Sequence, residues 1–386
     1  MWRCTGLTPD EGFMRMAIDV AKIGQSQTSP NPLVGALVVR DGVVVGQGAH
    51  LRAGGPHAEV HALRMAGDLA EGATMYVTLE PCNHYGRTPP CTEAILQAGV
   101  SRVVIASVDH DPRTKNLGIS RLRDAGVEVQ VGVLQDEAQA LNKAFFHRVD
   151  TGRPYVVYKA AMTLSGHVAA DTGHSQYVTG PAARAQVQQL RRNHPAIAVG
   201  IETVLADAPR LTVRDETGAA TGILQPTRVI FDSHLRIPVS AKLLDEPGRT
   251  IVITTEQAAC DHSEKLSQLT AIGEVEVIPV AQSAGHLDLA EGLAAVADRG
   301  CNSLLLEGGP RLAAAFFERQ LVDEVVIYIA PKLLMSGKSA LAGSPSTYMG
   351  EAISLRDIQV EAVNGDWKFT AAVDYGAAKD AADEMR

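Results

Sequence analysis

The stretch that decides the fold is residues 57–91, HAEVHALRMAGDLAEGATMYVTLEPCNHYGRTPPC. It offers one imidazole, His57, and two thiols, Cys82 and Cys91, each directly preceded by proline. A tetrahedral zinc ion takes four ligands, and a catalytic zinc keeps one of the four positions for water. These side chains therefore predict a zinc site with an open fourth position. Glu59 stands two residues after the histidine, too close to bind the same ion easily but well placed to move the protons of that water.

This arrangement is typical of zinc-dependent nucleobase deaminases, in which the glutamate is a general acid and base and not a ligand. Bound zinc lowers the pKa of its water to about 7. The plain alternative is two buried thiols and a core histidine, which the prolines beside both cysteines disfavour. A purely structural zinc is also disfavoured, because structural sites usually have four protein ligands and no fourth is evident near Cys82 or Cys91.

Composition limits the classes of protein that the chain can belong to. At 386 residues it is long enough for two domains. Hydrophobic residues make up 46% and aromatic ones only 4%, so aliphatic side chains must fill the cores. The formal net charge of −9 argues against a general affinity for nucleic acid, which needs a basic face. We therefore expect a few placed arginines to hold any substrate phosphate.

The cysteines and the apolar segments of the sequence indicate the cellular compartment of the protein. The five cysteines show no disulfide spacing, and their odd number favours a reducing environment. The N-terminus has no apolar segment of the signal-peptide kind, and no run of about 18 apolar residues is present. We expect a cytoplasmic protein that does not enter a membrane.

Helix and strand patterns alternate before residue 151. A capping box at residues 8–11 predicts a first helix. The segment Gly46-Gln47-Gly48-Ala49-His50 predicts a close approach of the backbone to another element, with His50 facing either a ligand or solvent. The alternation predicts an α/β sandwich around a mixed sheet. Further helices are expected at 57–66 and 91–98 and one ending near 146, with strands at 34–39, 43–45, 75–79, 103–108 and 127–133.

A second alternating pattern begins after residues 151–154, TGRP, which are rich in breaking residues. We therefore expect one domain over residues 1–150 and another over 151–376. The tail, residues 377–386, lacks a strong apolar pattern, as disordered tails do. In the second domain helices are expected notably at 181–192 and 310–319, and strands at 156–161, 197–200, 228–231, 251–254, 275–280, 303–306 and 324–329.

With these residues in view, nearly the whole chain resembles the bifunctional riboflavin-biosynthesis deaminase/reductase family. The matching segments in the first half are PNPLVG (30–35), HAEVHA (57–62) and TLEPCNHYGRTPPC (78–91). Those in the second half are GIETVLAD (200–207), RLTVR (210–214), FDSHLRIP (231–238) and EGGP (307–310). The long spacing between the two cysteines is itself a mark of the family.

The resemblance implies a cytidine-deaminase-like α/β/α domain followed by a dihydrofolate-reductase-like α/β domain. It implies that zinc-activated water in the first domain deaminates 2,5-diamino-6-(5-phosphoribosylamino)pyrimidin-4(3H)-one. The second domain would then use NADPH to reduce the ribosyl group, giving 5-amino-6-(5-phosphoribitylamino)uracil. The expected ligands are thus Zn²⁺, NADPH and a small phosphorylated pyrimidine. We also expect a homo-oligomer, either a dimer or a tetramer.

The resemblance assigns site residues by position. In the first domain Glu59 is the catalytic group, and substrate contacts are expected from Asn31, His50, His84, Arg87 and Asp109. In the second domain Lys159 and Asp207 are assigned to catalysis. Substrate contacts there are expected from Ser175, Arg191, Arg214 and Glu307, and cofactor contacts from Tyr177, Thr179, Thr203, Asp207, Ser233, Gly308 and Gly309.

The chemistry of these side chains supports some of the assigned roles, but a non-functional role is also possible for several of them. Arg191 and Arg214 suit a phosphate because guanidinium forks match its oxygens, although either alone can be a solvated surface charge. Gly308 and Gly309 open a helix directly after a strand, as in a cradle for cofactor phosphate, although a glycine pair also makes a simple turn. Asp207 is either a proton carrier or a capping carboxylate.

The chain departs from the family pattern at a few positions. Loop 109–116 reads DHDPRTKN where relatives have Asp-Pro-Asn-Pro, with Asp111 at a position that is often Asn. Ser165 stands where Asp is usual, and Tyr177 where Trp is usual. The first two departures put local polar contacts in question, whereas Tyr177 keeps an aromatic wall. Arg87 replaces a common lysine and keeps the charge with a different geometry.

Two other functions remain to be weighed. One is a single-function zinc deaminase for a nucleoside or nucleobase, with a non-catalytic C-terminal domain. The acidic charge and the motifs of the second half count against it. The other is a Rossmann dehydrogenase, which is disfavoured because no complete Gly-x-Gly-x-x-Gly follows a strand.

Overall fold

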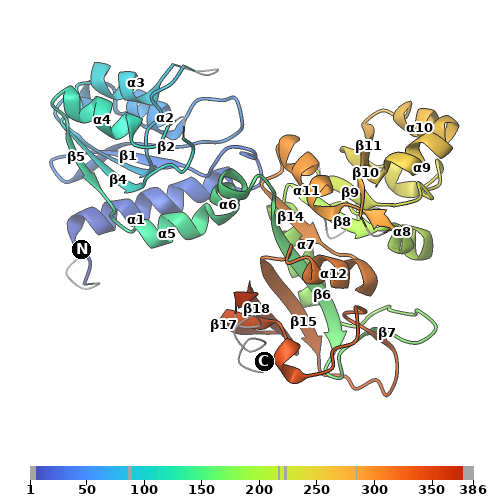
Figure 1. Cartoon of the computed structure of the whole chain (residues 1–386). Helices are drawn as coiled ribbons and strands as arrows, with labels where there is room; N and C mark the ends of the chain where they lie inside the picture. Colours follow the sequence, from blue (N-terminus) through green and yellow to red (C-terminus); the bar gives the residue numbers. More distant parts are fainter. Residues whose placement is uncertain are drawn as a thin grey trace. The chain divides into compact units, whose positions relative to one another are not determined.

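The computed structural model describes residues 6–85, 89–112, 114–215, 218–220, 224–283 and 285–376. The chain divides into two compact units, Met1–Gly152 and Arg153–Arg386. Helix α6 (Lys143–Thr151) lies before the division and is followed by Gly152, whose φ of 73° is the left-handed conformation that favours glycine at a helix end. The tail, for which the sequence predicts disorder, lies outside the described residues. Figure 1 shows the order of the elements along the chain.

The first unit is built on a five-stranded sheet in the order β2-β1-β3-β4-β5. Strand β1 pairs antiparallel with β2 and β3, whereas β3, β4 and β5 run parallel, so the predicted mixed sheet is confirmed. The strands are β1 (Gly35–Arg40), β2 (Val43–Ala49), β3 (Thr74–Leu79), β4 (Arg102–Ser107) and β5 (Glu128–Val131). The helices are α1 (Pro9–Ala21), α2 (Ala58–Ala66), α3 (Cys91–Gln97), α4 (Leu117–Asp124), α5 (Gln135–Leu141) and α6 (Lys143–Thr151).

Helices cover both faces of this sheet, and the alternation of side chains along β1 shows how. Leu37 and Val39 belong to one apolar cluster, with residues of α1 and α5. Ala36 and Val38 point the other way, into a cluster that contains residues of α2, α3 and α4. The result is the predicted α/β/α sandwich, visible in Figure 1 as helices on either side of the blue-to-teal sheet.

The glycines of β2 face the helix that carries the candidate site. A Cβ atom on Gly46 would lie 2.2 Å from the carbonyl oxygen of Ala62, and one on Gly48 would lie 2.3 Å from that of Ala58. No side chain fits at such distances, so the two glycines let β2 lie directly on the backbone of α2. The predicted close approach is therefore confirmed, and its partner is α2, from Ala58 to Ala66.

The second unit is built on a nine-stranded sheet in the order β11-β10-β9-β8-β14-β6-β15-β18-β17. Its strands from β11 to β15 run parallel, and β18 and β17 close the sheet as an antiparallel pair. The sheet strands are β6 (Tyr155–Thr163), β8 (Ala196–Gly200), β9 (Thr227–Phe231), β10 (Thr250–Thr255), β11 (Val275–Val280), β14 (Ser303–Leu306), β15 (Glu324–Ala330), β17 (Ser354–Val363) and β18 (Asp366–Asp374).

Helices and short strands complete this unit. Strands of the parallel part confirm all seven strands predicted for it, whereas the sequence did not predict the hairpin of β17 and β18. Two apolar clusters lie on opposite faces of the sheet. The helices are α7 (Pro181–Asn193), α8 (Ile201–Asp207), α9 (Glu256–Asp261), α10 (Ser263–Thr270), α11 (Leu289–Asp298) and α12 (Pro310–Glu318), and the short strands are β7 (His167–Ala169), β12 (Gln282–Ser283), β13 (His286–Leu287) and β16 (Lys338–Ser339).

The parallel strands of both sheets bring their following loops together. Strands β9, β8 and β14 are neighbours and end at Phe231, Gly200 and Leu306. In α/β sheets of this kind, ligands bind outside the carboxyl ends of the strands. In the first unit β3 and β4 are neighbours in the same sense, so the loops after Leu79 and Ser107 also meet.

Within the described residues, no helix combines the length and apolar character that crossing a membrane requires.

We expect Gly48→Ala to destabilise the first unit by about 1–3 kcal/mol, because the added methyl group must push β2 away from α2. Urea unfolding followed by a signal from the first unit measures the change. Gly273→Ala is the control, since a Cβ there meets nothing within 4 Å. Equal stability of the wild type and Gly48→Ala would contradict the proposed contact.

Candidate active sites

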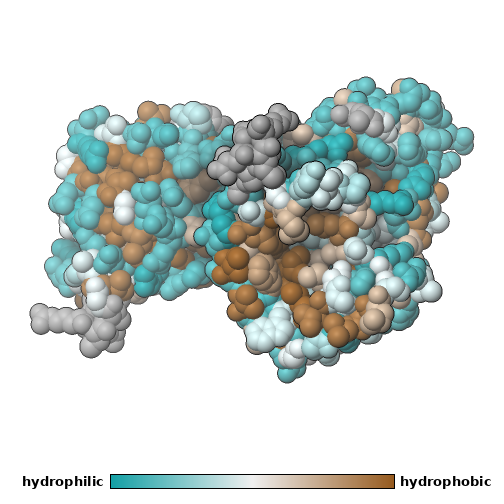
Figure 2. Space-filling view, turned by 60° about the horizontal axis from the view of Figure 1, so that its bottom comes forward, coloured by the Kyte–Doolittle hydropathy of each residue, from teal (hydrophilic) through white to brown (hydrophobic). Residues whose placement is uncertain are grey.

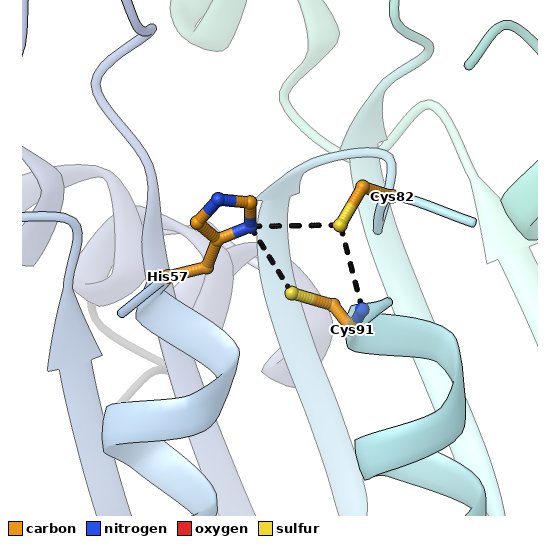
Figure 3. Close-up of side chains that lie close together, drawn as sticks. All are labelled: His57, Cys82 and Cys91. Atoms are coloured by element: carbon orange, nitrogen blue, oxygen red, sulfur yellow. Dashed lines mark hydrogen bonds between the residues drawn. The ribbon is translucent and has the colours of Figure 1, made fainter. Parts of the chain in front are cut away.

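The first candidate site joins three side chains from three different elements. His57 is the residue at which helix α2 begins, Cys82 follows β3, and Cys91 is the first residue of α3. Their ligand atoms all lie within 4.8 Å of one another. The Nδ1 atom of His57 is 3.2 Å from the Sγ atom of Cys91 and 3.5 Å from that of Cys82 (Figure 3).

These distances can be compared with what zinc requires. Zinc binds thiolate sulfur at about 2.3 Å and imidazole nitrogen at about 2.0 Å, so a tetrahedral angle separates the two atoms by roughly 3.5 Å. The observed separations are of this size. A hydrogen bond from the thiol of Cys91 lowers the pKa of Cys82 to about 4, so one thiolate is already present at neutral pH. The donor set therefore fits a zinc ion.

Glu59 lies in the first turn of α2, and its side chain is turned into the interior. The residue is only 3% exposed, and its Oε2 atom has no hydrogen-bond partner among the described residues. Burial raises the pKa of this carboxyl group. A buried carboxyl oxygen without a partner is costly, so Glu59 has the placement of a group that exchanges protons with a ligand beside Cys91.

Asn31 and His50 lie beside the ligands and form a connected pair. The Nδ1 atom of His50 is 3.0 Å from the carbonyl oxygen of Pro56, which can only accept, so Nδ1 carries the proton. The Nε2 atom then accepts from the amide of Asn31 at 2.9 Å. Burial lowers the pKa of His50, which keeps the ring neutral. Its ring meets that of His57 edge to face, with the centroids 5.3 Å apart.

The other residues predicted to bind substrate in this unit differ in their burial and surroundings. Asp109 follows β4 and is buried, with burial raising its pKa and its carboxylate accepting from the backbone of Asp111 at 3.0 Å. His84 is exposed on the loop between the two cysteines. Arg87 lies outside the described residues. The structure thus brings Asn31, His50 and Glu59 to the three ligands.

The second candidate site contains a group of charged side chains that are largely buried. Arg191 on α7 donates two hydrogen bonds to the carboxylate of Glu307, at 2.7 and 3.0 Å. The Nζ atom of Lys159 on β6 is 3.9 Å from the same carboxylate. Burial would raise the pKa of Glu307, but the charges of Arg191 and Lys159 outweigh it and lower the pKa to about 2. The group therefore carries one net positive charge.

The pairing of Arg191 changes what can be expected of it. Its Nη1 atom also donates to the carbonyl oxygen of Thr212 at 3.3 Å, so most of the fork is engaged within the protein. Arg214 is different, because its Nε atom is buried without a partner among the described residues. The hydroxyl of Thr212 is likewise buried and unpartnered there. The Nε–H group of Arg214 and the hydroxyl group of Thr212 can therefore donate hydrogen bonds to an anionic ligand. Ser175, in contrast, is exposed.

A cavity of about 930 Å³ lies at the carboxyl ends of β8, β9 and β14. Its lining includes three of the residues predicted to bind the cofactor, namely Thr203, Ser233 and Gly309. Gly309 is also the residue at which α12 begins, so free backbone N–H groups are present beside the cavity. Phe231, His286 and Arg311 also line it but were not predicted as site residues. Phe231 opens the matching segment FDSHLRIP and Arg311 directly follows the segment EGGP, whereas His286 has no such signal.

The remaining predicted residues of the second unit do not line this cavity. Asp207 is exposed at the end of α8, and Gly308 precedes the lining residue Gly309. Tyr177 is 64% exposed and has the guanidinium of Arg184 over its ring at 4.3 Å, whereas Thr179 is buried. The cofactor roles of these four residues stay predictions.

Ser165 makes local contacts where relatives have Asp. Its hydroxyl group bonds the backbone nitrogen and the carbonyl oxygen of Leu334, both at 2.9 Å, and lies 3.1 Å from the Nδ1 atom of His167. Ser165 thus makes polar contacts with Leu334 and His167 at the position where relatives usually have Asp.

Comparison with known proteins gives the family. Residues 7–107 match the cytidine and deoxycytidylate deaminase zinc-binding region, and residues 154–369 match the RibD C-terminal domain. The riboflavin biosynthesis protein RibD of Escherichia coli is 44% identical over 344 residues, which are 87% of this chain and 91% of that protein. The chain belongs to the RibD family. RibD of Bacillus amyloliquefaciens is 42% identical, over 94% of this chain and 96% of its own.

Solved structures of RibD proteins agree with the fold. Acinetobacter baumannii RibD superposes with a TM-score of 0.86 at 36% identity, covering 95% of this chain and 99% of its own. A deaminase/reductase from Thermotoga maritima gives a TM-score of 0.81 at 33% identity, with the same coverage. The predicted fold class, a cytidine-deaminase-like domain followed by a reductase domain of the RibD type, is confirmed.

Membership of the RibD family also confirms the general function. The chain is a bifunctional enzyme of riboflavin biosynthesis, with a zinc-dependent deaminase domain and an NADPH-dependent reductase domain. The alternative of a non-catalytic second domain is therefore not retained. A location in the cytoplasm stays a prediction.

Purified protein is expected to carry about one zinc per chain, and Cys82→Ser is expected to lose most of it, because only two of the three ligands remain. Metal analysis of both proteins is the measurement. Cys260→Ser is the matched control, since Cys260 is an exposed cysteine outside the cluster. Undiminished zinc in Cys82→Ser would remove the assignment.

Proposed function

We propose that the first unit deaminates 2,5-diamino-6-(5-phosphoribosylamino)pyrimidin-4(3H)-one, with zinc held by His57, Cys82 and Cys91. The Thermotoga maritima relative is a diaminohydroxyphosphoribosylaminopyrimidine deaminase and 5-amino-6-(5-phosphoribosylamino)uracil reductase by name. The observation that carries the proposal is the buried, unpartnered carboxyl oxygen of Glu59 next to the three ligand atoms. No other described carboxylate combines burial, a free oxygen and that position.

Each residue of the first site has its own role in the proposed deamination. Zinc, when bound, supplies a water of lowered pKa. Glu59 would take one proton from the attacking water and pass it to a ring nitrogen, and would then carry the proton of the newly added hydroxyl group to the departing amine, as a general acid and base does. Neutral His50, held by Pro56 and Asn31, packs edge to face against the ring of His57. Asp109, and Arg87 and His84 on their loop, are proposed to contact the ribose phosphate and the ring.

We further propose that the second unit reduces the ribosyl group of the deaminated product. Thr203, Ser233 and Gly309, which line the cavity, would hold NADPH, and the bound cofactor would supply a hydride for C1′ of the sugar. The C1′–O4′ bond must break before or as the hydride arrives, and O4′ then needs one proton. Lys159 is proposed to supply it, because burial lowers the pKa of its ammonium group while Glu307 keeps it in place.

The net positive charge at Lys159, Arg191 and Glu307 suits an anionic substrate. Arg214, with its buried unpartnered Nε atom, is proposed to bind the phosphate directly. Arg191 is proposed to act mainly by holding Glu307. As the resemblance implies, Asp207 is proposed for catalysis and cofactor binding, Ser175 for substrate binding, and Tyr177, Thr179 and Gly308 for cofactor binding.

We also propose that the chain associates through the hairpin of β17 and β18. Residues 355–362 of β17 are all exposed, although the strand belongs to a nine-stranded sheet. Val360 is 59% exposed, Ile358 56% and Trp367 51%. Figure 2 shows hydrophobic surface gathered over the second unit, viewed from the end that bears this hairpin. A second copy of the chain is the proposed partner, since two identical edges form a closed, two-fold contact.

Glu59→Gln is expected to keep zinc and fold but to slow deamination by about 10²–10⁴, the usual contribution of a general acid and base. Ammonia release from the diamino substrate measures this step. The same variant, given the deaminated intermediate, should oxidise NADPH at a near-normal rate. Deamination within a few-fold of the wild type would place the proton transfer elsewhere.

Lys159→Ala is expected to block reduction and to leave deamination intact, the reverse of Glu59→Gln. The two variants together test the order of the two reactions. Lys159→Ala should release ammonia normally and stall before the sugar is reduced. Glu59→Gln supplied with the diamino substrate and NADPH should accumulate no reduced product, because we propose that deamination comes first. Efficient reduction of the undeaminated substrate by Glu59→Gln would reverse that order.

The wild type is expected to sediment as a dimer or tetramer, and Val360→Lys to shift it toward a smaller species, since a charge would be buried in the contact. Analytical ultracentrifugation over a range of concentrations measures this. Val239→Lys is the control, because Val239 is apolar and 42% exposed but lies outside the hairpin. A monomeric wild type would rule the contact out.

A further inference from the structure

Glu80 is a buried carboxylate that neither of the two reactions uses. It stands between the end of β3 and the pair Pro81-Cys82, and it is only 4% exposed. Its two oxygens accept four backbone hydrogen bonds and no side-chain one among the described residues. Oε1 accepts from Gly118 at 3.0 Å and Ile119 at 3.3 Å, and Oε2 accepts from Asn116 at 2.9 Å and Asp109 at 3.4 Å.

Three of these donors belong to the start of helix α4. The first N–H groups of a helix have no partner within the helix, and a carboxylate near them is also favoured by the helix dipole. Asn116, the residue before α4, makes no capping hydrogen bond with its own side chain. Glu80 therefore caps α4 from another element of the fold.

The fourth donor makes the contact more than a helix cap. Asp109 and Asn116 are the first and last residues of loop 109–116, and both backbone N–H groups point to the same Oε2 atom. One carboxylate thus fixes the two ends of the loop. This loop carries Asp109, and it is where the chain departs from the usual pattern of its family.

The backbone around Glu80 joins the same elements. Its own N–H donates to the carbonyl oxygen of Ser107 at the end of β4, at 2.9 Å. A Cβ atom on Gly118 would lie 2.0 Å from the carbonyl oxygen of Pro81, so the start of α4 lies directly on the residue before the ligand Cys82. The position of the loop and that of Cys82 are therefore set by adjoining contacts.

We propose that Glu80 is a positioning residue of the deaminase: it holds both ends of loop 109–116 against the segment that delivers Cys82, and so sets where Asp109 meets the substrate. This inference rests on the proposed deamination in the first unit and on a substrate contact by Asp109. Glu80 itself touches neither the zinc ligands' sulfur atoms nor the reacting atoms in this role.

The test is steady-state deamination by Glu80→Gln, whose amide keeps the shape but sets N–H groups against N–H donors. We expect KM for the diamino substrate to rise about tenfold or more, because buried donors lose their acceptor and the loop shifts. The turnover number should change less than KM, and zinc should stay at about one per chain. Hydrogen exchange of a peptide covering residues 109–119 should quicken, whereas that of β3 and β4 should not.

Two further variants and the reductase activity of the same chain serve as controls. Glu93→Gln cuts the 2.9 Å ion pair between α3 and Arg121 of α4 without touching the loop, so its KM should stay at the wild-type value. Glu80→Asp keeps the charge on a shorter stem and should give an intermediate KM. NADPH oxidation with the deaminated substrate, catalysed by the second unit of the same chain, should be unchanged in all three variants.

The outcomes separate the inference from the function on which it rests. A wild type that does not deaminate overturns the proposed function and the inference together. An active wild type whose KM is unchanged in Glu80→Gln overturns the inference alone, and so does loss of zinc in step with activity, which would make Glu80 a support of the metal site. If Glu80→Gln also loses reductase activity, Glu80→Asp decides, and a wild-type KM in that variant overturns the inference.

Discussion

Three ligand atoms must come within a few ångströms of one another before a zinc ion can be held, and no single element of the first unit supplies them. His57 starts α2, Cys82 follows β3 and Cys91 starts α3. Their meeting depends on how closely α2 lies on the sheet, which Gly46 and Gly48 permit by leaving room for the helix backbone. The packing of the sheet therefore sets the geometry of the site, and the catalytic carboxyl of Glu59 follows from the same helix.

The second unit obeys a different constraint, since buried charges must be paired. Lys159, Arg191 and Glu307 come from β6, α7 and the loop after β14, and their side chains are 14%, 13% and 9% exposed. Removing one partner of such a group commonly costs about 3–5 kcal/mol, because the others stay buried without compensation. The trio thus has a structural and a chemical role, because it joins α7 to the sheet and leaves one positive charge for an anion.

What the sequence predicted well is local chemistry. The zinc ligands and Glu59 stand in short motifs whose residue types already imply their roles, and the parallel strands have continuous apolar runs. The pairing of Arg191 with Glu307 was not predicted, because 116 positions separate the two residues. The hairpin of β17 and β18 was missed because β17 is exposed on both faces, so its apolar residues show no buried alternation. The glycines of β2 predicted a close approach, but only the fold shows that α2 is the partner.

Both units place some of their functional side chains, among them Asp109 and Glu307, in loops at the carboxyl ends of parallel strands, and this explains how one of those loops tolerates a departure from the family. Side chains in such loops are free to vary only if something else fixes the backbone. In loop 109–116 the fixing contacts run from backbone N–H groups to Glu80, a residue outside the loop. Backbone donors are the same whatever the side chains are, proline excepted. The loop can therefore read DHDPRTKN and still hold Asp109 beside the segment that carries Cys82.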